Sequence, residues 1–142
     1  MNGGKVLNIK VLIVDDHVLF LESLKSVLLS NSSIQVINSL SYPSLLINTI
    51  TEVPPDIILM DIRIKSYNGL ELTRNIKKIA PHISVIILTG YNDEEYIDAA
   101  YSAGASAFIA KEKSKDLLIT TIKQVYEGYQ IFPKQNQLLS SN

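Results

Sequence analysis

Five short apolar runs recur along the chain, and between them apolar residues follow helical spacing. The runs cover residues 11–14, 34–37, 57–60, 85–88 and 107–110. The first, third and fourth are nearly continuous in valine, isoleucine and leucine, which is typical of strands covered on both faces. The helical spacing links Leu21 with Leu24 and Leu28, Leu46 with Ile50, Leu72 with Ile76 and Ile79, Ile97 with Tyr101, and Leu118 with Ile122 and Val125. The pattern therefore predicts five strands that alternate with five helices.

Residues that interrupt regular structure lie between these elements. Pro54-Pro55 and Pro81 precede two of the predicted strands, and Asn68-Gly69 lies in a predicted loop. Regular alternation of strand and helix predicts an α/β protein with a flavodoxin-like, doubly wound sheet of five parallel strands in the order 2-1-3-4-5 and five helices. We expect one domain over residues 8–131. The polar residues 132–142 are expected to be a tail or the start of a linker to an output domain that this chain lacks.

Composition narrows the functional classes. The chain has 142 residues, of which 46% are hydrophobic, enough for the core of one domain. Thirteen basic and 14 acidic residues give a net charge of −1, so charge provides no reason for binding nucleic acid or an anionic membrane. Without cysteines, disulfides, thiolate zinc sites and cysteine nucleophiles are excluded. With no signal peptide and no long apolar span, we expect a cytoplasmic protein without membrane contact.

Polar residues suited to phosphoryl chemistry follow four of the predicted strands. Asp15 and Asp16 follow the first strand, Asp61 the third, Thr89 the fourth and Lys111 the fifth. In the predicted strand order the first and third strands are neighbours, which brings the three aspartates together where ligands bind to such sheets. Two carboxylates about 4 Å apart repel by roughly 4 kcal/mol at an effective dielectric near 20, so three require a cation or shifted pKa values. Hard oxygen ligands favour Mg²⁺.

Together these side chains are suited to phosphoryl transfer. A carboxylate can attack phosphorus and form an aspartyl phosphate. A metal ion and the Lys111 ammonium would neutralise the transferring oxygens, and the Thr89 hydroxyl would donate to one of them. Taken singly, each residue has an ordinary structural explanation as a turn, a helix cap or a solvated amine. The combination carries the prediction.

Histidines and tyrosines are predicted to be structural. His17 and His82 are expected to be surface residues without a metal. Five tyrosines gather in the last third of the chain, where helix packing is favoured over an interaction face. They are Tyr91, Tyr96, Tyr101, Tyr126 and Tyr129.

Five sequence blocks resemble the receiver domains of bacterial two-component systems, in the family's order and spacing. They are VLIVDDH at 11–17, LMDIRI at 59–64, NGLELTR at 68–74, ILTGY at 87–91 and AGASAFIAKE at 103–112. The resemblance extends from Lys10 to about Phe132. It implies a switch that is phosphorylated by a sensor histidine kinase and dephosphorylates itself without acting as a turnover enzyme.

The resemblance also assigns roles to residues. It implies that Asp61 is the phosphoacceptor, Thr89 and Lys111 contact the phosphoryl group, and Phe108 is the switch aromatic. Asp15 and Asp16 would form the acidic pocket. Magnesium would be held by Asp16, Asp61 and the backbone carbonyl of Arg63, with Asp15 acting through water.

A histidine after the acid pair and the NGLE segment are similar to the NarL/LuxR class of DNA-binding regulators. That class carries a C-terminal helix-turn-helix domain, and this sequence stops at Asn142 before one could begin, so DNA would be bound only through a missing domain. Lys65 and Glu112 stand where the family often has proline. The Lys65 departure could alter phosphorylation or partner docking. Phosphorylation-promoted homodimerisation is a further expectation.

Two other classes and one variant remain as alternatives. A haloacid-dehalogenase-like phosphatase also uses an aspartyl phosphate, but its two aspartates are separated by one residue, whereas Asp15 and Asp16 are adjacent. A flavodoxin-like flavin carrier would need a phosphate loop after the first strand, where the two aspartates would repel phosphate. The third alternative is a stand-alone receiver relay.

Overall fold

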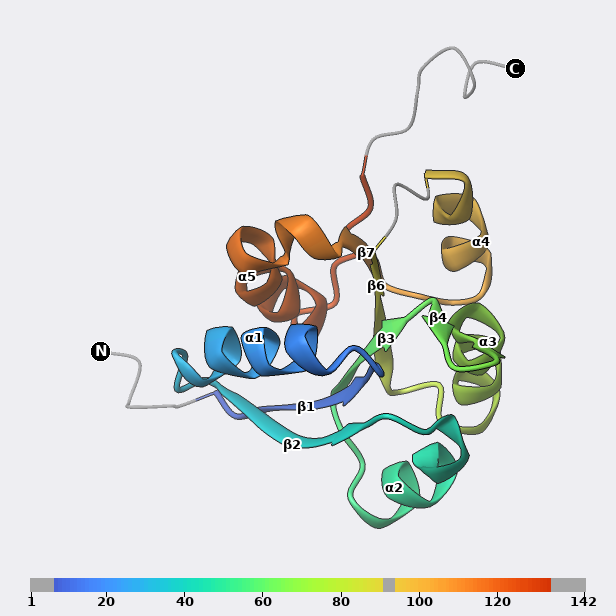
Figure 1. Ribbon diagram of the computed structural model, residues 1–142, viewed down its shortest axis with the longest axis horizontal. Coiled ribbons are helices and arrows are strands. Elements are labelled where there is room, and N and C mark those ends of the chain that lie inside the picture. Colours follow the sequence, from blue (N-terminus) through green and yellow to red (C-terminus); the bar gives the residue numbers. More distant parts are fainter. Residues whose placement is uncertain (1–6, 91–93, 134–142) are drawn as a thin grey trace.

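The computed structural model describes residues 7–90 and 94–133. In these residues five parallel strands form one sheet in the order β2-β1-β3-β6-β7 (Figure 1). These strands are β1 (Ile9–Val14), β2 (Ile34–Leu40), β3 (Ile57–Asp61), β6 (Ser84–Thr89) and β7 (Ala107–Ala110). Counted along the chain within this sheet, the order is 2-1-3-4-5, so the predicted flavodoxin-like topology is confirmed.

Within the described part of the chain, five α-helices connect or follow the strands, as predicted. They are α1 (Val18–Leu29), α2 (Leu46–Glu52), α3 (Gly69–Ile79), α4 (Ile97–Ser102) and α5 (Ser114–Tyr126). Single 3-10 turns precede three of them, at Pro43–Leu45, Glu94–Tyr96 and Lys111–Lys113. The start of α3 is capped by Asn68, whose side chain accepts a hydrogen bond from the Leu70 amide.

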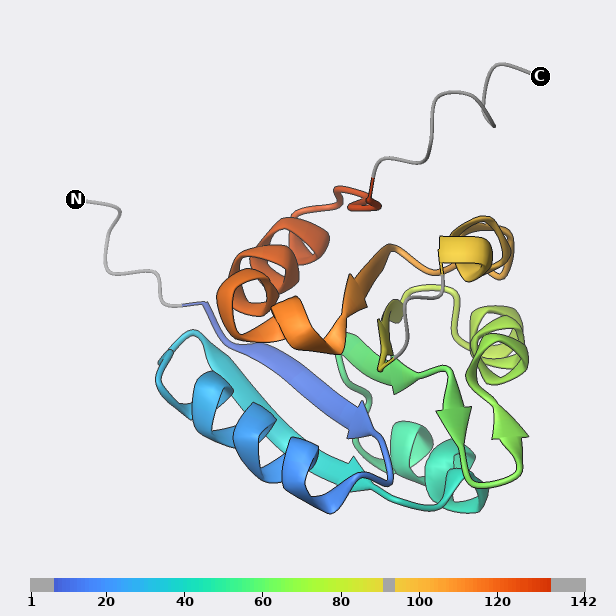
Figure 2. The ribbon, with the colours of Figure 1, turned by 45° about the horizontal axis from the view of Figure 1, so that its top comes forward.

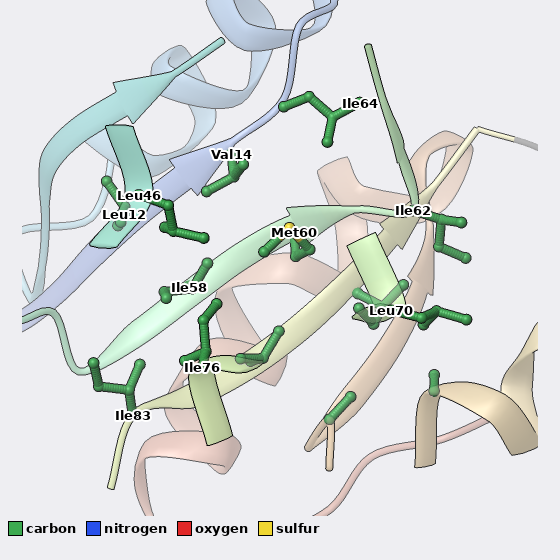
Figure 3. Close-up of a cluster of buried hydrophobic side chains, with 14 of the residues drawn as sticks. Leu12, Val14, Leu46, Ile58, Met60, Ile62, Ile64, Leu70, Ile76 and Ile83 are labelled. Atoms are coloured by element: carbon green, nitrogen blue, oxygen red, sulfur yellow. The ribbon is translucent and has the colours of Figure 1, made fainter. Parts of the chain in front are cut away.

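The sheet separates two hydrophobic layers. Helices α1 and α5 cover one face, and α2, α3 and α4 cover the other (Figures 1 and 2). Alternate strand residues supply the two layers: Val11 and Ile13 face α1 and α5, whereas Leu12 and Val14 belong to the opposite cluster, shown in Figure 3. Because both faces are covered, β1, β3 and β6 each contain a continuous run of four apolar residues, at 11–14, 57–60 and 85–88.

A small hairpin after β3 was not predicted. Its strands β4 (Arg63–Ile64) and β5 (Tyr67–Asn68) pair antiparallel. Strands of two residues are too short to show a periodic pattern, so the sequence offers no such signal. Buried Ile64 attaches the hairpin to the core (Figure 3), and the Gly69 amide closes its base by donating to the Ile62 carbonyl at 2.6 Å.

The chain beyond α5 returns to the edge of the sheet. Ile131 forms a parallel bridge with Ala107, and the Phe132 ring packs edge-to-face on Tyr101 at a centroid distance of 5.6 Å. Among the described residues no helix has the length and apolar character needed to span a membrane.

The tyrosines only partly follow their predicted packing role. Tyr96 is partly buried and packs against the core, but Tyr101, Tyr126 and Tyr129 are exposed. Tyr91 lies outside the described residues. For the three exposed rings the prediction of burial by helix packing was wrong, since each lies on the solvent side of its segment.

Candidate functional site

The predicted acidic residues meet at the carboxyl ends of neighbouring strands. Strands β1 and β3 pair in parallel with Val14 opposite Met60, so Asp15 and Asp61 follow at adjacent positions. Both side chains are buried, with residue exposures of 1% and 4%. The strand register therefore brings together residues 46 positions apart in the chain.

Lys111 supplies the positive charge of this pocket. Its Nζ lies 2.7 Å from Asp15 Oδ2 and 3.1 Å from Asp61 Oδ2, to which it donates a hydrogen bond. Asp15 Oδ2 has no well-directed hydrogen bond in the described residues, so the ion pair with Lys111 is what compensates its burial. The ammonium also lies 4.5 Å from the centre of the Phe20 ring, a cation–π contact.

The environment of Asp61 favours its neutral form. Burial raises the pKa of Asp61 most strongly, and the negative charge of Asp15 raises it further. The Lys111 ammonium and the Arg63 backbone amide act in the opposite direction without cancelling these effects. The ionised form of Asp61 is therefore stabilised by nearby positive charge. A bound cation would favour this form, which is the one that can act as a nucleophile.

The pocket has the composition of a divalent cation site. Asp15, Asp16, His17 and Asp61 each offer one ligand atom, and these atoms lie within 4.8 Å of one another. With all three carboxylates ionised, the Lys111 ammonium would offset one of their three negative charges and a bound cation would offset the other two. The carboxylate oxygens are hard ligands, which fits Mg²⁺.

The remaining predicted residues surround this pocket. Thr89 ends β6 one position beyond Leu88, the sheet partner of Asp61, and it is buried. The Arg63 amide lies 3.4 Å from Asp61 Oδ1, which places Arg63 beside the phosphoacceptor candidate. Phe108 is buried on β7 within the layer under α4. Thr89 and Arg63 therefore lie at the same edge of the sheet as the acidic residues and Lys111, whereas Phe108 lies within β7 and pairs with Ile87 of β6.

His17 belongs to the pocket more closely than the sequence indicated. Its side chain is 59% exposed, consistent with a surface residue, but its Nδ1 lies 3.2 Å from Asp15 Oδ1, 3.5 Å from Asp61 Oδ2 and 3.0 Å from Lys111 Nζ. Adjacency to the acid pair was the signal that could have placed it here. His82 is exposed, as predicted.

A hollow opens beside Lys111 at the mouth of the pocket. It is lined by His17, Leu19, Phe20, Gly90 and Lys111. Gly90 leaves room next to the lysine, because an added Cβ would come no closer than 3.6 Å to Lys111 Cδ. Two of the lining residues, His17 and Lys111, contact the Asp61 carboxylate, so the hollow adjoins this side chain.

Comparison with protein families gives a match to the response regulator receiver domain over residues 11–123. The transcriptional regulatory protein DegU of Brevibacillus brevis is 33% identical over 120 residues, which cover 84% of this chain and 51% of DegU. The response regulator protein VraR of Staphylococcus epidermidis is 32% identical over 124 residues, covering 87% of this chain and 59% of VraR. The chain thus spans between half and two thirds of these relatives.

Solved structures share the fold. The isolated receiver domain of RcsB from Salmonella enterica serovar Typhimurium aligns with a TM-score of 0.85 at 21% identity, covering 95% of this chain and all of that one. The receiver domain of NarL from Mycobacterium tuberculosis aligns with a TM-score of 0.79 at 20% identity, covering 86% of this chain and 98% of that one. At these identities the likeness establishes the architecture alone.

Proposed function

Because this chain belongs to the response regulator receiver domain family, we propose that it is the phosphoacceptor of a two-component system and is phosphorylated on Asp61 by a sensor histidine kinase. The observation that carries the proposal is the position of Asp61: buried, with its Oδ2 3.1 Å from Lys111 Nζ, and within 4.8 Å of the other acidic ligand atoms. Family membership sets aside the phosphatase and flavin-carrier alternatives.

In the proposed reaction an Asp61 carboxylate oxygen attacks the phosphorus of a phosphohistidine. The new bond joins phosphorus to that oxygen, and the bond between phosphorus and the histidine nitrogen breaks, which leaves the electron pair on the imidazole. The Lys111 ammonium, 3.1 Å from Asp61 Oδ2, stabilises charge on the transferring oxygens. The Thr89 hydroxyl donates to one of these oxygens in the product.

Asp16, Asp61 and the Arg63 backbone carbonyl are the residues that would hold Mg²⁺, with Asp15 acting through water. The bound ion supplies positive charge that offsets repulsion between the carboxylates and the incoming phosphoryl oxygens. Within the chain, Asp15 also holds Lys111 at 2.7 Å and so keeps the ammonium over the pocket.

The output is proposed to be conformational. Phosphorylation adds about −1.5 to −2 charge at Asp61, and Thr89 on the adjoining strand is drawn toward it. Phe108 then repacks in the space that Thr89 leaves, so the segment after Thr89 and α4 become the two-state element. The chain returns to its resting state by hydrolysing its own aspartyl phosphate rather than by turning over a substrate.

The relatives suggest the setting of this switch. DegU is named a transcriptional regulatory protein. We propose that residues 8–131 form the receiver unit and that residues 132–142 lead toward a DNA-binding output domain, in a cytoplasmic regulator that dimerises on phosphorylation. A stand-alone relay is the alternative, and the full gene product would distinguish the two.

Incubation with Mg²⁺ and acetyl phosphate tests the assignment. The chain should gain the mass of one phosphoryl group in an alkali-labile bond, and Asp61→Asn should abolish the gain. Asp16→Ala and Lys111→Ala should fold but lose most of the Mg²⁺-dependent labelling. Full labelling of Asp61→Asn at another residue, or normal rates in both other variants, would refute the proposed site.

A further inference from the structure

A hydrogen bond joins the tip of the β4–β5 hairpin to the acidic pocket. The Lys65 backbone amide donates to Asp16 Oδ2 at 3.0 Å, across 49 positions of the chain. The other carboxylate oxygen, Asp16 Oδ1, lies on the pocket side, 3.8 Å from His17 Nδ1. The hairpin therefore engages one oxygen of Asp16 and leaves the second turned toward the cation site.

Lys65 adopts a backbone conformation that its side chain disfavours. Its φ is 56°, and it is the one non-glycine residue with positive φ among residues 7–90 and 94–133. Lys65 and Ser66 form the two-residue loop between the paired residues Ile64 and Tyr67. Glycine is the usual residue where the first position of such a loop has positive φ. Something other than local preference therefore holds the lysine here.

Contacts on both sides brace the hairpin. At its base Ile62 and Ile64 are buried in the core (Figure 3). At its tip the Lys65 ammonium lies 4.8 Å from the centre of the exposed Tyr42 ring, in the segment between β2 and α2, toward which the hairpin extends in Figure 2. The buried base thus supports the hairpin that presents the Lys65 amide to Asp16, while the ammonium makes a contact on the exposed surface.

We propose that the Lys65 backbone amide is a positioning group that orients the Asp16 carboxylate and thereby sets the affinity of the pocket for Mg²⁺. The inference rests on the proposed function, since it assumes a cation at this pocket. Hydrogen bonds to a ligating carboxylate restrict its orientations before the metal binds, so less freedom is lost on binding. Lys65 touches no reacting atom, and its effect passes through Asp16.

Three substitutions at one position separate the amide from the side chain. Lys65→Pro removes the amide hydrogen and requires a φ near −65°. Lys65→Gly keeps the amide and adopts positive φ readily, and Lys65→Ala keeps the amide without the ammonium. Calorimetric titration with MgCl₂ should show Mg²⁺ binding weakened about tenfold in Lys65→Pro, the lower end of the usual effect for a group behind a metal ligand. The other two variants should stay close to the unaltered chain.

The rate of phosphorylation should separate Lys65→Pro from the other two variants in the same way. With acetyl phosphate, Lys65→Pro should need more Mg²⁺ for half-maximal phosphorylation while reaching the same rate at saturating Mg²⁺. A general loss of structure would lower the saturating rate as well. Equal weakening in Lys65→Gly and Lys65→Pro would assign the effect to the side chain and overturn the proposal.

Hydrogen exchange tests the contact even if Lys65→Pro fails to fold. In the unaltered chain the Lys65 amide should exchange slowly, and Asp16→Ala should speed its exchange while the core amide of Ile58 stays protected. Fast exchange of Lys65 in the unaltered chain would overturn the inference. If the unaltered chain binds Mg²⁺ and all three variants bind it equally, the inference alone fails. If the unaltered chain binds none, the proposed function fails with it.

Discussion

At the scale of single residues, Gly69 is constrained by the backbone at the end of β3. A Cβ at this position would overlap the carbonyl oxygen of Asp61 and lie 3.0 Å from Ile62 Cα, and both are backbone atoms that cannot move away cheaply. Gly69→Ala should therefore lower the free energy of unfolding by about 1–3 kcal/mol in a urea titration. Gly90→Ala is the matched control, because its nearest neighbour is a lysine side-chain carbon at 3.6 Å. Equal stability of the two variants would contradict this account.

The raised pKa of Asp61 makes the stability of the folded chain depend on pH. Because the folded-state pKa lies above the ordinary value of 3.8, the contribution of Asp61 to stability is complete below pH 3.8 and is lost as pH rises through the folded-state pKa. Asp61→Asn removes the charge that burial and Asp15 penalise. In metal-free buffer at pH 7 this variant should therefore melt a few degrees higher than the unaltered chain.

Two comparisons check that interpretation of Asp61. The gain in melting temperature should shrink as the pH is lowered toward 3.8, and added Mg²⁺ should narrow it at pH 7 by stabilising the unaltered chain alone. A gain independent of both pH and Mg²⁺ would point to packing instead of charge.

Some residues of the candidate site could be predicted from the sequence, and others could not. Asp61 and Lys111 could be found because each follows an apolar run, and parallel strands end at one edge. The roles of His17 and Lys65 could not be found in this way. His17 could have been placed only by its adjacency to the acid pair. The contact of Lys65 with Asp16 is made by a backbone amide in a turn, which has no signal in the amino-acid pattern.

At the scale of elements, the segment after α5 closes the edge of the sheet at β7. The Ile131 amide donates to the Ser106 carbonyl at 2.8 Å, and the Phe108 amide donates to the Ile131 carbonyl at 3.1 Å. Ile131→Pro removes the first donor and disturbs the pairing, so the Phe108 amide should exchange faster and the protein should lose about 1–2 kcal/mol of stability. The exposed Gln130→Ala is the control. Unchanged exchange of Phe108 would show that this pairing does not form in solution.

The elements themselves were predictable to the extent that they were long and buried on a regular face. The predicted runs all became strands of the sheet, because each supplies apolar side chains to the two covered faces. The sequence predicted less well which side of each helix is buried. Ile79 follows the helical spacing of α3 but is 57% exposed, since the inward side of that helix is formed by Leu70, Thr73 and Ile76.

At the scale of the whole molecule, the exposed side of α4 is where we expect two copies of the chain to associate. Tyr101 is 58% exposed on α4, the helix that follows the Thr89 segment, and it contacts Phe132 at the returning end of the chain. A change at Asp61 that moves Thr89 would thus alter an exposed aromatic surface rather than a buried one. Phosphorylation can promote dimerisation through this surface only if the phosphorylated and unphosphorylated states bind a second copy of the chain with different affinities.

Sedimentation velocity with beryllofluoride and Mg²⁺ tests this association. The unaltered chain should shift from monomer toward dimer when the phosphoryl mimic is added, whereas Asp61→Asn under the same conditions should remain a monomer. Tyr101→Asp should weaken the mimic-dependent dimer about tenfold or more while leaving Mg²⁺ binding intact, because a desolvated carboxylate opposes burial of this surface. A monomer at all concentrations with the mimic bound would exclude dimerisation as the output of this domain. A dimer unaffected by Tyr101→Asp would place the contact on another face.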